Sequence, residues 1–139
     1  MSAPMRAIVI TESLEGRALP APLAQWEDRR YPHLLDERTP IEIIECAVPA
    51  ERAAEAALAL AKVLLPELYY AHLLDEQRML VAFPGIVAQI DRGDAAACER
   101  AQAVGALFKI PADQMRFLEM FDEDHPDAPA ATARDGAAR

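Results

Sequence analysis

The sequence predicts a single α+β domain built around a mainly antiparallel sheet. Three observations lead to this prediction: short apolar runs separated by turn-forming residues, two longer stretches with helical periodicity, and three of the short runs in direct succession. The chain has 139 residues, of which 53% are hydrophobic, so it can bury a core. We expect one domain over residues 1–121.

Two strands are predicted in the first third of the chain. Residues 6–12 (RAIVITE) form a β-branched run, and residues 41–48 (IEIIECAV) are apolar on both faces except at Glu42 and Glu45. Between them, residues 13–40 contain one glycine and four prolines. This composition predicts an irregular, proline-rich insert that either packs on the body or moves, with LAQWEDRR as its one helical piece.

Two amphipathic helices are predicted. Apolar residues recur at helical spacing over residues 51–65, and Pro66 ends that helix. Asp94 can cap a second helix over residues 95–108. Gly105 lies within the apolar face of this helix, and a residue of such low helix propensity indicates a close packing contact there.

Three strands are predicted between the helices, at residues 68–74, 78–83 and 86–91, and they form a meander. A last short helix is expected within residues 111–121. Residues 122–139 contain no large apolar residue, which predicts a disordered acidic tail.

This order of elements predicts a two-layer sandwich with both main helices on one face, ferredoxin-like with an extra N-terminal strand. Such a sheet has one uncovered face. We expect either the insert or a second copy of the chain to cover this face. If a second copy covers it, the protein is a homodimer.

The charge of the chain excludes some classes of function. The formal net charge is -9, so binding to nucleic acid through phosphate neutralisation is not expected. The sequence has neither an apolar run of about 20 residues nor the pattern of a signal peptide, so we expect a cytoplasmic protein that does not bind membranes. In that compartment Cys46 and Cys98 are expected to be reduced and buried.

His72 is a weak candidate for catalysis. Strand alternation places it on the same face as Tyr70, and its near-neutral pKa suits a general acid or base. The alternative is a histidine that satisfies a hydrogen bond on a half-buried sheet face. We favour this alternative because no nucleophile or acid lies at a diagnostic spacing.

No metal or cofactor is predicted. His33, His72 and His125 lie far apart in the sequence, with no spacing typical of a metal site. The chain also lacks the glycine-rich loops that bind phosphates or dinucleotides.

The insert combines aromatic and cationic side chains in an otherwise acidic chain: Trp26, Arg29, Arg30, Tyr31 and His33. This composition is typical of a recognition surface for an anionic ligand or a protein partner. Alternatively, the aromatic residues cap an apolar sheet face while the arginines pair with Glu27, Asp28 and Asp36.

The second half of the chain resembles a family of small uncharacterised bacterial and archaeal proteins. The resemblance rests on an aromatic pair followed by Ala-His on a strand, and on an Ile-Pro-x-acid-Gln turn that ends in Phe. The matching positions are Tyr69, Tyr70, Ala71, His72, Phe83, Ile110, Pro111, Asp113, Gln114 and Phe117. Where that family has Tyr-Gly, this chain has Leu-Phe before Lys109. The resemblance implies a fold and no catalytic residue.

These observations favour a non-catalytic binding or assembly module, in which Trp26, Arg29, Arg30, Tyr31, Tyr70 and His72 hold a protein partner or a small anionic ligand. A second hypothesis is a small enzyme with His72 as general acid or base and Arg29 or Arg30 binding an anionic substrate. A third is an acidic inhibitor of a nucleic-acid site, which requires the carboxylates to cluster on one face.

Overall fold

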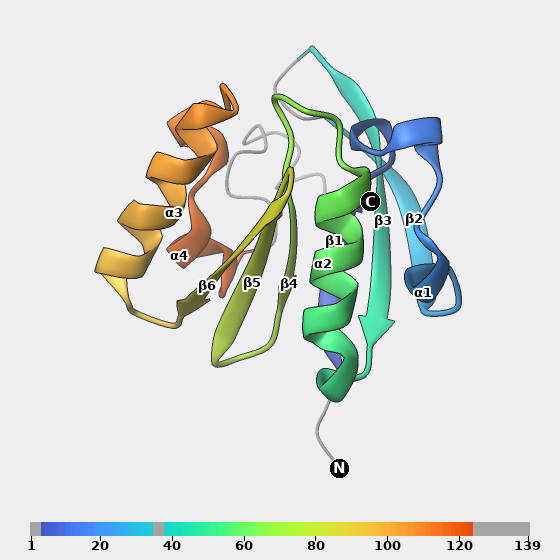
Figure 1. Ribbon diagram of the computed structural model, residues 1–139, viewed down its shortest axis with the longest axis horizontal. Coiled ribbons are helices and arrows are strands. Elements are labelled where there is room, and N and C mark those ends of the chain that lie inside the picture. Colours follow the sequence, from blue (N-terminus) through green and yellow to red (C-terminus); the bar gives the residue numbers. More distant parts are fainter. Residues whose placement is uncertain (1–3, 35–37, 124–139) are drawn as a thin grey trace.

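A computed structural model describes residues 4–34 and 38–123, and this part of the chain forms one antiparallel sheet of six strands (Figure 1). The strand order is β2-β3-β1-β4-β5-β6. The strands are β1 (Met5–Ile10), β2 (Glu27–Leu34), β3 (Pro40–Val48), β4 (Ala71–Leu74), β5 (Arg78–Phe83) and β6 (Ile86–Asp91). The predicted α+β class and five predicted strands are confirmed.

Strand β1 lies at the centre of the sheet, antiparallel to β3 on one side and to β4 on the other. Strands β3 and β4 therefore run parallel to each other with β1 between them. Helix α2 (Ala53–Val63), preceded by a 3-10 turn at Ala50–Arg52, connects them. Two hairpins then add β5 and β6 at one end, and β2 pairs with β3 at the other.

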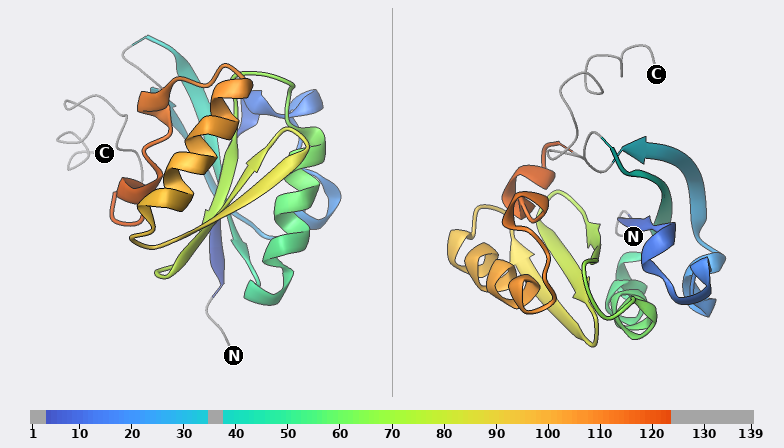
Figure 2. Two further views of the ribbon diagram at one scale, coloured as in Figure 1. Left: turned by 60° about the vertical axis from the view of Figure 1, so that its left-hand side comes forward. Right: turned by 90° about the horizontal axis from the view of Figure 1, so that it is seen from above.

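The two main helices pack on opposite faces of the sheet (Figure 2). Helix α2 shares a core with Leu73 and Leu80, whereas α3 (Ala95–Leu107) and α4 (Phe117–Met120) share a second core with Met79, Val81 and Phe83. The expected two-layer, ferredoxin-like arrangement with both helices on one face is therefore not confirmed. The physical reason is that β5 is apolar on both faces, so each face needs its own cover.

The expected irregular insert at residues 13–40 contains regular structure. It includes a 3-10 turn at Glu15–Arg17, helix α1 (Ala21–Ala24) and the edge strand β2. The prediction of a helix over LAQWEDRR (residues 23–30) is wrong for most of its length: α1 ends at Ala24, and residues 27–30 belong to β2. The Trp26 carbonyl already accepts a hydrogen bond from the Ala47 backbone N–H at 2.9 Å. Charged residues and Pro32 are compatible with β2 because it is an edge strand, with only one neighbour to pair with.

The predicted tail begins with residues that contact the body. Asp122 pairs with Arg92 at 3.0 Å. The rest of that prediction, for residues 124–139, lies outside the described residues. None of the helices in the described ranges is long and apolar enough to cross a membrane.

Helix α3 has the predicted N-cap and the predicted close contact at Gly105. The Asp94 carboxylate accepts a hydrogen bond from the Ala97 backbone N–H at 3.0 Å, so the predicted N-cap is confirmed. Gly105 is buried against Met115 and Phe83, and a Cβ atom at this position would overlap the Met115 Sδ atom. The glycine therefore allows the segment before α4 to approach the helix.

We predict that Gly105→Ala lowers the free energy of unfolding by about 1 kcal/mol. Overpacking a filled core costs about 1–3 kcal/mol, which exceeds the gain of about 1 kcal/mol in helix propensity. Urea denaturation measures the change, with Ala103→Gly on the exposed face of α3 as the propensity control. A more stable Gly105→Ala protein would contradict the close contact.

Candidate functional site

A buried carboxylate lies on β3. Glu45 is 3% exposed and shares its sheet face with the core residues Ile41 and Ile43. Burying a charged group costs free energy unless hydrogen bonds and opposite charges compensate for it. The partners of Glu45 therefore define the chemistry of this part of the sheet.

Three side chains from two neighbouring strands contact Glu45. Its Oε2 atom accepts hydrogen bonds from the Tyr31 hydroxyl at 2.7 Å and from Arg29 Nη2 at 3.1 Å. Its Oε1 atom lies 3.8 Å from Arg6 Nη1. We call Arg6, Arg29, Tyr31 and Glu45 the Glu45 cluster. Its formal charge is one positive unit, in a chain whose net charge is -9.

The strand register creates this cluster. Arg29 lies directly opposite Glu45 in the β2–β3 pair, and Ile8 lies opposite Glu45 in the β1–β3 pair. Arg6 is two residues before Ile8 and so shares its face. The Arg29 guanidinium also lies 4.9 Å from the centroid of the Tyr31 ring. The cluster therefore depends on the correct pairing of three strands.

The two guanidinium groups are at the surface, whereas their shared carboxylate is beneath it. The side chains of Arg6 and Arg29 are 38% and 60% exposed. A guanidinium has five N–H donors in a fixed plane, and a carboxylate beneath two such groups restricts how they can turn. Glu45 thus orients two cations toward solvent.

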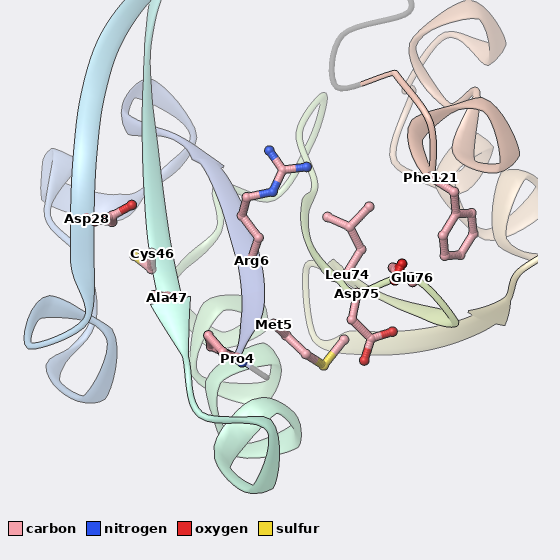
Figure 3. Close-up of a pocket in the computed structure, with 10 residues that line it drawn as sticks. All are labelled: Pro4, Met5, Arg6, Asp28, Cys46, Ala47, Leu74, Asp75, Glu76 and Phe121. Carbon is pink, nitrogen blue, oxygen red and sulfur yellow. The ribbon is translucent and has the colours of Figure 1, made fainter. Parts of the chain in front are cut away.

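A cavity of about 510 Å³ adjoins the cluster at Arg6 (Figure 3). This volume lies within the range of about 300–1,000 Å³ typical of small-molecule sites. The lining residues come from β1 and the residue before it, from β2, β3 and the end of β4, from the β4–β5 turn and from the segment after α4: Pro4, Met5, Arg6, Asp28, Cys46, Ala47, Leu74, Asp75, Glu76 and Phe121.

Arg92 fixes one wall of the cavity. It donates a hydrogen bond to the Glu76 carbonyl at 2.6 Å and pairs with Asp122 at 3.0 Å. Its guanidinium also lies 5.0 Å from the centroid of the Phe121 ring. One side chain therefore connects the β4–β5 turn to the segment that follows α4.

The structure separates the residues of the predicted recognition surface. Arg29 and Tyr31 belong to the Glu45 cluster. Arg30 lies on the other face of β2, where it pairs with Glu27 at 2.6 Å and with Glu42 at 3.1 Å, and its hydrogen bond lowers the pKa of Glu27. Trp26 packs against the core shared with α2, and the Arg52 guanidinium lies 5.3 Å from its ring centroid.

Tyr70 and His72 share a face, as alternation predicted. This face is also that of the cluster, but the two residues lie nearer to α4. His72 is 6% exposed, and its ring centroid is 5.9 Å from that of Tyr70. Tyr70 donates a hydrogen bond to the Gln114 carbonyl at 2.5 Å and packs edge-on against Phe117. In the strand register Ile8 separates His72 from Glu45, and His72 is not one of the residues that line the cavity.

Sequence reasoning missed Arg6 and Glu45 as site residues. Glu45 had a usable signal, because it is one of two charged residues in a strand that is otherwise apolar on both faces. Arg6 had none, since a cation at the start of a strand is common on any protein surface.

Cys46 is one of the residues along the cavity, but its side chain is packed in the core shared with α2 and cannot act as a ready nucleophile. Burial raises the pKa of its thiol to about 11, so the thiol stays protonated near neutral pH. Within the described ranges, no group of three or more His, Cys, Asp or Glu side chains is placed to hold a metal ion.

We predict that Glu45→Gln lowers the free energy of unfolding by about 1–3 kcal/mol. The amide group would present donors to a hydroxyl and two guanidinium groups that need an acceptor. Urea denaturation measures the loss. The control is Glu55→Gln, which breaks an exposed pair with Arg52 and should change stability by no more than about 1 kcal/mol. Equal effects of the two substitutions would contradict an anchoring role for Glu45.

The raised pKa of Cys46 predicts a loss of stability at alkaline pH. The folded protein favours the neutral thiol, so this contribution is fully present below the ordinary pKa of 9.0 and is lost as the pH rises toward about 11. Over that interval we expect the free energy of unfolding of the wild type to fall by up to about 2–3 kcal/mol more than that of Cys46→Ala. Chemical denaturation at pH 8, 9.5 and 11 tests this.

Comparison of the chain with protein-family models, curated proteins and solved structures finds no match, so its function has to be argued from the site.

Proposed function

We propose that the protein is a non-catalytic binding module that holds a small ligand with an anionic group at the Glu45 cluster and the adjoining cavity. The observation that supports this proposal is the buried carboxylate of Glu45, which contacts Arg6 and Arg29 on two different strands. Their charge-assisted hydrogen bonds are suited to carboxylates and phosphates.

The cost of burying Glu45 supports a role beyond stability. A buried ion pair is seldom more stable than apolar residues of similar volume, so its charge has to be explained in another way. Here the charge orients two guanidinium groups beside a cavity, and pre-orientation lowers the entropy lost when a ligand binds. The cluster itself carries one surplus positive charge, which favours an anionic group placed at Arg6 and Arg29.

The enzyme hypothesis has less support. It pairs His72 with Arg29 or Arg30, but Arg30 lies on the opposite face and His72 lies among Tyr70 and the residues near α4. The protonated thiol of Cys46 offers no alternative nucleophile. A homodimer and a cytoplasmic location stay predictions.

We predict that Arg29→Gln and Arg6→Gln each weaken the binding of small carboxylates or phosphate about tenfold or more, since each removes a charge-assisted hydrogen bond worth about 1.5–3 kcal/mol. NMR titration of the labelled protein with sodium phenylacetate, 4-methylpentanoate and phosphate measures the affinities.

The matched control is Arg30→Gln, which removes the same charge from the neighbouring residue on the opposite face. It should change affinity less than about twofold, as expected for a charge that only adds to the long-range field. If Arg29→Gln and Arg30→Gln weakened anion binding equally, the arginines would act only through non-specific charge attraction. Failure of every anion to shift resonances of the cluster would refute the proposal.

A further inference from the structure

The cavity beside the Glu45 cluster has charges of both signs in its lining. Arg6 is its one basic residue, and Asp28, Asp75 and Glu76 are its three acidic residues. Asp28 comes from the irregular position of β2, between Glu27 and Arg29, where the register with β3 shifts. In Figure 3, Arg6 lies between Asp28 on one side and the β4–β5 turn on the other.

The three carboxylates differ in what they do within the fold. Asp75 Oδ1 accepts hydrogen bonds from the backbone N–H groups of Gln77 and Arg78 at 2.8 and 2.9 Å, so it closes the β4–β5 turn. Asp28 and Glu76 are exposed residues at opposite sides of the cavity. These two are therefore the carboxylates placed to meet a ligand.

The rest of the lining is mostly apolar. Leu74 and Phe121 face each other beside Arg6 (Figure 3). Arg92 holds Phe121 in this position through its ring contact and its bond to the Glu76 carbonyl. An apolar group can therefore lie beside charges of opposite sign.

We propose that this cavity binds a zwitterion of the amino-acid type: a carboxylate on Arg6, an ammonium group on Asp28 or Glu76, and an apolar side chain against Leu74 and Phe121. This inference rests on the proposed function and names its ligand class. A ligand with only negative charge would meet three carboxylates in the lining, and one with only positive charge would meet Arg6 and its neighbour Arg29. A zwitterion matches both sets of charges at once.

The test uses the full chain and isothermal titration with L-leucine and L-phenylalanine. Each amino acid is compared with its N-acetyl derivative, which lacks the ammonium charge, and with its amide, which lacks the carboxylate. The free amino acids should bind at least about tenfold more tightly than either derivative, because each derivative leaves one set of charges unmatched.

Two variants assign the groups. Arg6→Gln should lower the affinity for the free and N-acetyl amino acids about tenfold and change the affinity for the amides by less than about twofold. The double variant Asp28→Asn/Glu76→Gln should lower the affinity for the free amino acids to that of their N-acetyl derivatives. It should not lower the affinity for the N-acetyl derivatives. Its matched control, Glu51→Gln/Glu99→Gln, removes two exposed carboxylates that do not line the cavity and should change nothing.

The outcomes separate this inference from the proposed function. If N-acetyl amino acids or phosphate bind as tightly as free amino acids and depend on Arg6, the zwitterion is wrong and the anion-binding function stands. If no amino acid, carboxylate or phosphate binds, both are wrong. If the double variant and its control weaken binding equally, the acidic residues do not recognise the ammonium group and the inference is overturned.

Discussion

Strand β5, inside the sheet, is apolar on both faces, and the placement of the helices depends on this constraint. Strand β5 alternates between Met79, Val81 and Phe83 on one face and Leu80 and Ala82 on the other, and all five side chains are buried. Neither face can be left in water without a large loss of hydrophobic free energy. Helix α2 therefore covers one face, and α3 with α4 covers the other.

The polar site occurs on the α3 side of the sheet, toward its β2 edge. One cross-strand row on that face runs through Val81, His72, Ile8, Glu45 and Arg29. It begins in the core shared with α3 and ends at a cation that is 60% exposed. The sheet thus changes along a single row from a packed surface to one that can meet a ligand. His72 lies on the packed part of this row and Glu45 at the transition.

Local patterns predicted the elements that depend on local physics. Strand β3, the Asp94 cap and the close contact at Gly105 follow from alternation, capping chemistry and helix propensity, and all three are confirmed. The opposite placement of α2 and α3 could not be predicted in this way, since periodicity shows that a helix has an apolar face and does not show which side of a sheet it covers. Strand β2 was missed because its charges and Pro32 are typical of loops as well as of edge strands. The partners of Glu45 come from β1 and β2, so they become neighbours only when the sheet forms.

Strand β2 has a second property that follows from its position. Among the residues that the structure describes, no strand pairs with its outer side, and its charged residues, together with Pro32, discourage another chain from adding a strand there. Arg29 belongs to this protective set as well as to the Glu45 cluster. The proposed anion binding and the protection of this edge would thus depend on the same side chain. Replacing Arg29 to adapt the site to an uncharged ligand would also make intermolecular pairing at the edge easier.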